Sequence, residues 1–151
     1  MCGIAGIMLS GGTVTRKMLE PMAARLSHRG PDGSGFIADG AFGLAHTRLS
    51  IIDLEGGQQP ILARDRNMAL VANGEIYNYL ELRKEFQRQG RSFATHSDSE
   101  TILHAYALDS ENFVKRLNGM FAFALFDGER RKLIQGKGPP GNQTTLLCAA
   151  P

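Results

Sequence analysis

The chain has 151 residues, of which 42% are hydrophobic and 21% charged, with a formal net charge of +2. This composition is typical of one globular domain, and no run of basic and aromatic residues indicates a nucleic-acid partner. The apolar run at residues 3–9 is too short to cross a membrane and no basic segment precedes it, so we expect a cytoplasmic protein without a membrane partner.

The first half of the chain is predicted to be rich in strands, over residues 2–9, 36–38, 43–48 and 68–72. Residues 13–27 have helical apolar spacing, but Pro21 predicts a kink or a late start. The glycine-rich segment 28–35 is predicted to be a loop, and residues 56–60 interrupt the apolar stretch that precedes them.

The second half is predicted to hold three helices and a hairpin. The Asn78 and Glu81 pair has the spacing of a capping box, which predicts a helix that ends at Gly90. Further helices are expected over residues 101–108 and near 111–117, and strands over 119–126 and 131–134. Because strands and helices do not alternate regularly, the fold class is predicted to be α+β, with sheets covered by helices.

Cys2 offers chemistry that few residues can. If Met1 is removed, the thiol and a free α-amine sit on one residue, and an α-amine with a pKa of about 7.7–8 is a usable base at neutral pH. The amine can take the thiol proton, the thiolate can attack an acyl carbon, and the ammonium can protonate the leaving group. The alternative is a small, inert cysteine in a buried strand. Cys148 is too far along the chain to suggest a disulfide framework, so both thiols are expected to stay reduced.

Other polar residues could complete an acyl-transfer site. Asn73 and Gly74 follow a predicted strand, where an amide and a backbone N–H could form an oxyanion hole, although Asn-Gly alone indicates a turn. Arg48 could bind a carboxylate with two hydrogen bonds or lie on the surface. Glu75 and Asp98 could receive an ammonium group, with helix capping as the alternative for Asp98.

Two other kinds of site are not supported by the sequence. The four histidines lack metal-ligand spacing and no carboxylate cluster accompanies them, so no metal site is predicted. The glycines at residues 30–35 lack the Lys-Ser/Thr ending of a phosphate-binding loop.

Five separated motifs resemble, in order and spacing, the glutaminase domain of glutamine-hydrolysing asparagine synthetases. They are Met1-Cys2-Gly3-Ile4, His28-Arg29-Gly30-Pro31-Asp32, Arg48-Leu49-Ser50-Ile51-Ile52-Asp53, Asn73-Gly74-Glu75-Ile76-Tyr77-Asn78 and Ser97-Asp98-Ser99-Glu100. The wider group is the class II glutamine amidotransferases, which belong to the N-terminal nucleophile hydrolases. The resemblance implies a four-layer αββα sandwich over residues 1–134.

The resemblance also implies the roles of particular residues. Cys2 is the nucleophile and base, Asn73 and Gly74 form the oxyanion hole, and Arg48 binds the α-carboxylate of glutamine. The α-amino group is assigned to Glu75 and Asp98, and the backbone around Ile51 and Ile52 lines the pocket. The reaction implied is hydrolysis of L-glutamine to L-glutamate and ammonia through a thioester.

In full-length relatives, a second domain uses ATP and magnesium to pass the ammonia to an acceptor carboxylate. This domain is not found in the sequence, so no cofactor is expected for the glutaminase half, and a synthetase domain or subunit is the expected ammonia acceptor. Two readings stay open: an active glutaminase, or an inactive truncated remnant that serves as an interaction module.

The resemblance stops after Ile134, where residues 135–151 lack the expected strand-turn-strand pattern. Codons permitted for residues 135–149, read one base later, can spell the family continuation. We therefore expect a one-base shift in the gene or its reported sequence, with a naturally short protein as the alternative. A shifted tail is expected to be disordered or poorly packed, to give Cys148 no role and to leave a sheet edge exposed.

Overall fold

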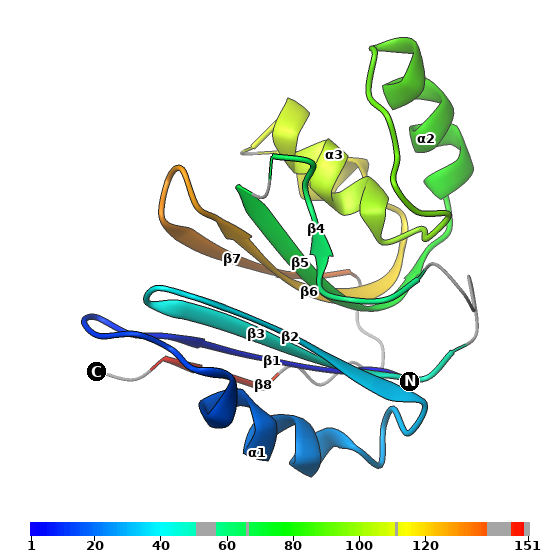
Figure 1. The fold of residues 1–151 in the computed structure, drawn as a ribbon. Coiled ribbons are helices and arrows are strands. Elements are labelled where there is room, and N and C mark those ends of the chain that lie inside the picture. The colour runs from blue at the N-terminus through cyan, green and yellow to red at the C-terminus, as the bar shows by residue number, and fades with distance from the viewer. Residues whose placement is uncertain (51–56, 66, 111, 139–145, 150–151) are drawn as a thin grey trace.

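The structure is a computed structural model that describes residues 1–50, 57–65, 67–110, 112–138 and 146–149. Two four-stranded sheets lie face to face (Figure 1). Sheet A has the strand order β2 (Gly33–Asp39), β3 (Phe42–Arg48), β1 (Gly3–Met8) and β8 (Leu146–Ala149). Sheet B has the order β4 (Ile61–Leu62), β5 (Met68–Ile76), β6 (Gly119–Asp127) and β7 (Lys132–Lys137).

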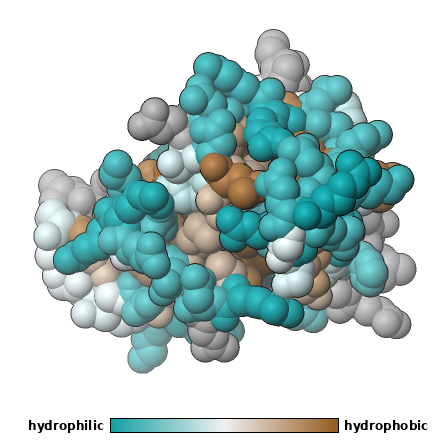
Figure 2. All heavy atoms as spheres, turned by 90° about the horizontal axis from the view of Figure 1, so that it is seen from above, coloured by the Kyte–Doolittle hydropathy of each residue, from teal (hydrophilic) through white to brown (hydrophobic). Residues whose placement is uncertain are grey.

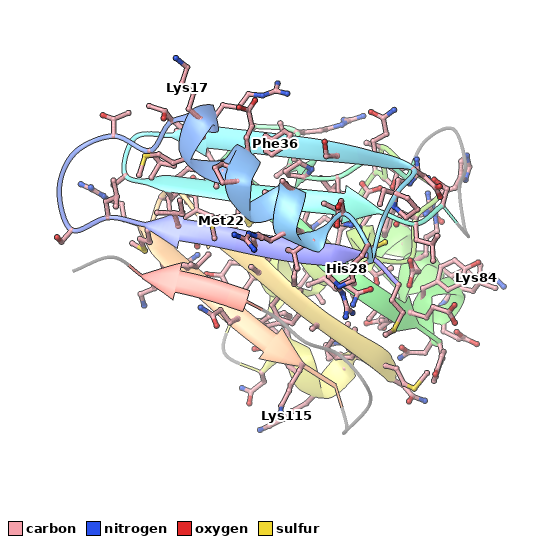
Figure 3. The ribbon with its side chains drawn as sticks, turned by 90° about the horizontal axis from the view of Figure 1, so that it is seen from below. Lys17, Met22, His28, Phe36, Lys84 and Lys115 are labelled. Atoms are coloured by element: carbon pink, nitrogen blue, oxygen red, sulfur yellow. The ribbon has the colours of Figure 1, made fainter. Side chains whose placement is uncertain are left out.

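Helices cover the outer face of each sheet. Helix α1 (Arg16–Leu26) lies across sheet A, with Met22 and Phe36 packed beside its buried core (Figure 3). Helices α2 (Tyr79–Arg88) and α3 (Glu100–Leu108), with the 3₁₀ turn η1 (Phe113–Arg116), cover sheet B. The molecule is therefore the α+β, four-layer αββα sandwich that the sequence predicted.

Three apolar clusters hold these layers together. One lies under α1 and one under α2 and α3. The third fills the space between the sheets, where residues of β1 and β3 meet residues of β5 and β6. Its buried members are Ile4, Phe42, Leu44, Ala69, Val71, Ala122 and Ala124. Hydrophilic side chains cover most of the outer face seen from above in Figure 2, so burial is concentrated between the layers.

Several predicted boundaries differ from the structure. Helix α1 begins at Arg16 and runs through Pro21 to Leu26, so the helix does not start late at Pro21. Strand β2 begins at Gly33, so the predicted loop over 28–35 was too long. Asn78 does not cap α2 with its side chain: its Nδ2 donates to the Arg116 carbonyl and its Oδ1 accepts from the Asn118 N–H, both at 2.9 Å. The side chain thus ties the start of α2 to the start of β6.

The C-terminal tail also differs from expectation. Strand β7 continues through Gln135 to Lys137, and these residues pair with β6. Strand β8 pairs with β1 in parallel, with Ala5 opposite Leu146. The expectation that the tail would not pair with the rest of the fold was therefore wrong for these residues. Within the described part of the chain, no helix is long and apolar enough to cross a membrane.

Candidate active site

Cys2 lies immediately before β1 and is held by contacts to both its backbone and its sulfur. The Leu49 N–H donates to Sγ at 3.3 Å, and the thiol lies 3.6 Å from the Leu49 carbonyl. The Arg29 Nε donates to the Cys2 carbonyl at 3.2 Å. Because side chains alternate along a strand, Cys2 shares the face of Ile4, which points toward sheet B.

The residue after the cysteine is fixed as well. The Gly3 N–H donates to Thr47 Oγ1 at 3.1 Å, and Thr47 Oγ1 donates to the Leu26 carbonyl at 3.1 Å. A Cβ on Gly3 would lie 2.5 Å from Thr47 Oγ1 and 2.8 Å from the Leu26 Cβ, so glycine lets β1 approach β3 and α1 closely. The end of β1 therefore presents Cys2 from a tightly packed backbone.

Asn73 and Gly74 lie inside strand β5, which pairs with β6 as far as Ile76. The predicted strand end and turn at Asn-Gly were therefore wrong. Gly74 nonetheless has a φ of +130°, and a Cβ there would lie 1.9 Å from the Met120 carbonyl oxygen. Only glycine fits this position of the strand without strain.

Backbone donors on one edge of β5 face the site. The Ala72 N–H donates to Gln59 Oε1 at 2.6 Å and the Ile76 N–H donates to Asp98 Oδ2 at 2.7 Å. Gly74 lies two residues from each, so its N–H faces the same edge, away from β6. That direction is the one an oxyanion-hole donor needs.

Asp98 is only 5% exposed and does not cap α3 with its carboxylate. It binds the Ile76 N–H instead, so the capping alternative was wrong. Its neighbour Glu100 is also buried and accepts hydrogen bonds from the Ala94 and Thr95 N–H groups and the Thr95 hydroxyl, each at 2.7 Å. These bonds fix the segment that leads to Asp98.

One cavity of about 220 Å³ brings most of the predicted residues together. Its walls come from the ends of β1, β3 and β5, the segment after β3 and the segment before α3. They include every described residue that the sequence proposed: Cys2, Arg48, Asn73, Gly74, Glu75 and Asp98. The predicted Ile51 and Ile52 lie outside the described residues.

Sequence reasoning missed several residues of this cavity. His46 and Gln59 line its walls, as do Ser97, Ser99 and Met120. The sequence marks His46 only as one of the histidines that lack metal-ligand spacing. His46 is two residues from both Leu44 and Arg48 along β3, so the three side chains share one face of the strand. Gln59 belongs to the segment 56–60 that interrupts an apolar stretch, and nothing in its local sequence predicts that it lines the cavity.

The chain also resembles known proteins. The chain matches the family described as "Glutamine amidotransferase domain" over residues 1–143. It is 40% identical over 144 residues to a probable glutamine-hydrolysing asparagine synthetase of Dictyostelium discoideum, and 37% identical over 145 residues to asparagine synthetase 1 of Bacillus subtilis. Each match covers 93% of this chain but only 26% and 23% of those relatives.

The fold has a solved counterpart. Glutamine phosphoribosylpyrophosphate amidotransferase of B. subtilis superposes with a TM-score of 0.65 at 22% identity, covering 84% of this chain and 35% of the other. The chain therefore shares the fold of that amidotransferase. The chain belongs to the glutamine amidotransferase domain family, and the curated relatives that it resembles are asparagine synthetases.

Proposed function

We propose that this chain hydrolyses L-glutamine to L-glutamate and ammonia through a γ-glutamyl thioester on Cys2. The observation that supports this most directly is the cavity itself, where a cysteine, the Asn73-Gly74 pair and an arginine with two carboxylates converge. Nucleophile, oxyanion donors and an amino-acid receptor are the parts that acyl transfer from glutamine needs.

The proposed reaction begins after removal of Met1, which itself lines the cavity. The Cys2 amine takes the thiol proton, and the sulfur attacks the side-chain carbonyl carbon of glutamine. Negative charge on the carbonyl oxygen is stabilised by the Asn73 amide and the Gly74 N–H. The carbon–nitrogen bond then breaks, and the protonated amine donates its proton to the departing ammonia. Water hydrolyses the thioester, which releases glutamate and restores the thiol.

Substrate orientation is assigned to the charged wall of the cavity. Arg48 binds the α-carboxylate with paired hydrogen bonds, and Glu75 and Asp98 bind the α-ammonium group. Asp98 is buried and already fixed by the Ile76 N–H, so it offers a preset charge, whereas Glu75 is exposed at the rim. The pocket backbone around Ile51 and Ile52 completes this proposal.

We propose that this half-reaction needs no cofactor, because Cys2 supplies both nucleophile and base. Ammonia release that is unchanged by a metal chelator is the expected result, and loss of activity with EDTA would contradict it. ATP, magnesium and an acceptor carboxylate such as aspartate belong to a synthetase domain or subunit, since the chain spans about a quarter of the length of its curated relatives. A free thiol suits the cytoplasm.

Ammonia release from L-glutamine tests the proposal. Cys2→Ala and Cys2→Ser should both nearly abolish turnover, while Cys2→Ser should still bind glutamine because Arg48, Glu75 and Asp98 are unchanged. Cys148→Ser is the matched control, since it removes the other cysteine of the sequence, and its turnover should equal that of the wild type. Comparable turnover by the serine variant at position 2, or none by the wild type, would reject the function and favour an inactive module.

The mass of the purified N-terminus tests whether the Cys2 α-amine is free to act as the base. We expect loss of Met1, which frees the Cys2 amine. A fully active protein that retains Met1 would show that another group accepts the thiol proton.

A further inference from the structure

Glu100 ends the segment 97–100 that carries Asp98, yet the proposed reaction gives it no role. It lies in the first turn of α3, is 4% exposed and does not line the candidate active site. Its two carboxylate oxygens turn back along the chain and accept the N–H groups of Ala94 and Thr95. Because a buried charge opposes folding unless it is bonded, this carboxylate must serve the segment around it.

The Thr95 hydroxyl connects Glu100 with the cavity wall. It donates to Glu100 Oε2 at 2.7 Å, and its oxygen accepts the Ser97 N–H at 3.2 Å. Ser97 Oγ in turn accepts the Ser99 N–H at 3.3 Å. The residues on both sides of Asp98 are therefore held by a series of hydrogen bonds that begins at the Glu100 carboxylate.

Asp98 itself is fixed through its backbone and through one carboxylate oxygen. The N–H and the hydroxyl of Thr101 both donate to the Asp98 carbonyl, at 3.0 Å and 2.6 Å. The Ile76 N–H donates to Oδ2 at 2.7 Å, while Oδ1 lies 3.5 Å from the Ser99 hydroxyl. A carboxylate oxygen can accept more than one hydrogen bond, so Oδ1 can still receive an ammonium group.

Helices α2 and α3 hold the other side of this network. The Arg83 Nη2 donates to the Thr95 carbonyl at 2.6 Å, and its guanidinium lies 4.2 Å from the centre of the Phe93 ring. His104 Nε2 lies 3.4 Å from Glu100 Oε1. Burial alone would raise the pKa of Glu100, but hydrogen bonds from His104 and Thr95 help to lower it to about 2. Glu100 is therefore charged at pH 7, which strengthens the bonds that it accepts.

We propose that Thr95 and Glu100 are positioning residues that fix Asp98 for the α-ammonium group of the substrate, and that they thereby set the preference of the site for an α-amino acid. The inference rests on the proposed glutamine hydrolysis, in which Asp98 binds that group. A carboxylate that is fixed before binding loses little further freedom when the substrate arrives, so its attraction for the ammonium group appears in the affinity.

Two substitutions at Thr95 separate the hydroxyl from the shape of the side chain. Thr95→Val keeps the shape but removes both hydrogen bonds, whereas Thr95→Ser keeps the hydroxyl. We expect Thr95→Val to raise the KM for L-glutamine about 10-fold, close to the lower value of one hydrogen bond to a charged group, with little change in kcat. Thr95→Ser should restore most of the affinity. An unchanged KM in Thr95→Val, or equal increases in the two variants, would overturn the proposal.

Glutaramate, which is glutamine without its α-amino group, shows whether the effect passes through Asp98. This compound has no ammonium group for Asp98 to bind. Its inhibition constant should therefore be the same for the wild type and for Thr95→Val, while the KM for glutamine rises. A general loosening of the cavity would weaken the binding of both compounds equally, and that result would overturn the proposal.

Tyr106→Phe is the matched control for lost stability. Tyr106 lies on α3, is 3% exposed and does not line the cavity, and its hydroxyl donates to Asp127 Oδ2 at 2.7 Å. The variant also loses one hydroxyl from the interior, so it should be less stable than the wild type, but its KM for glutamine should be unchanged. A rise in KM equal to that of Thr95→Val would show that lost stability explains the effect.

Glutamine binding to proteins that carry Cys2→Ser tests the inference apart from turnover. Calorimetric titration of L-glutamine into Cys2→Ser, with and without Thr95→Val, should show the same difference of about 10-fold in Kd. Equal Kd values would reject the role of Thr95 even if the wild type releases ammonia. The expected difference in Kd without ammonia release from the wild type would instead reject the proposed hydrolysis and support the positioning of Asp98.

Discussion

Cys2 has a small side chain but many constraints around it. Its carbonyl accepts from Arg29, its sulfur contacts Leu49, and the N–H of the next residue binds Thr47. These contacts fix the sulfur before substrate arrives, so little ordering is left for the reaction itself. Two other side chains of the cavity, those of Arg48 and Asn73, have chemistry that no close substitute reproduces.

Arg48→Lys should raise the KM for glutamine by about 10- to 100-fold, because an ammonium group cannot reproduce a two-bond grip and the lost charge-assisted hydrogen bond is worth about 1.5–3 kcal/mol. Steady-state ammonia release checks this. Arg25→Lys, an exposed change in the last turn of α1, is the control and should leave KM unchanged. Equal KM values for both variants would remove Arg48 from carboxylate binding.

Asn73→Ala should lower kcat about 10²- to 10³-fold, the usual effect of losing one oxyanion-hole donor. Asn67→Ala serves as the control, since Asn67 lies in an exposed turn where its side chain donates to Glu129. Stopped assays at saturating glutamine measure the difference. An unchanged kcat in the Asn73 variant would assign the oxyanion to other donors.

At the scale of the element, β5 is a strand whose ladder to β6 is complete, while its other edge faces the candidate site. Along that edge, Gln59 and Asp98 take the N–H groups of Ala72 and Ile76, and Gly74 lies between them. The side chains of Gln59 and Asp98 thus take the place of a neighbouring strand on either side of the Gly74 N–H. The positive φ of Gly74 is where the strand departs from regular geometry.

Gly74→Ala should both destabilise the protein and abolish turnover. Its φ of +130° costs a non-glycine residue about 1–3 kcal/mol, and the new Cβ would meet the Met120 carbonyl. Urea unfolding and ammonia release measure the two effects. Gly11→Ala is the control, because no atom lies within 4 Å of its Cβ position. Wild-type stability and activity in the Gly74 variant would contradict the backbone geometry.

Sequence patterns predicted the long elements well but not the details of β5. Alternation and helical spacing identify strands and helices, since each element has its own period. Asn73-Gly74 was read as a turn because the local preference of the dipeptide is strong, and the pairing with β6 that overrides it is long-range. Similarly, the pairing of β8 with β1 joins residues more than 130 positions apart, which no local pattern can show.

The site residues were predictable for a different reason. Cys2, Arg48 and Asp98 carry chemistry that their residue types reveal, and their motifs resemble a known family. Gln59 accepts a hydrogen bond from the Ala72 N–H, and a backbone partner leaves no mark in the sequence.

At the scale of the molecule, the site depends on how two separate sheets pack against each other. Two buried groups, His46 of β3 and Glu100 of α3, respond to acid in different ways. Burial lowers the pKa of His46 to about 4, from an ordinary value of 6.5. Burial alone would raise the pKa of Glu100, but hydrogen bonds from His104, Thr95 and the Ala94 N–H together lower it to about 2.

These shifts predict how stability falls with pH. Below pH 6.5 the unfolded chain protonates His46 while the folded chain does not until about pH 4, so the free energy of unfolding should fall across this range, by about 3 kcal/mol from this group. Glu100 stabilises the fold above pH 4.5, and this contribution is lost as the pH falls toward 2. Urea unfolding of the wild type and of His46→Asn at pH 7, 5.5 and 4.5 measures the fall in stability that His46 causes. The variant should lose less stability than the wild type between pH 7 and 4.5, because it has no imidazole to protonate on unfolding. Parallel curves of stability against pH for the two proteins would show that His46 is not held neutral in the fold.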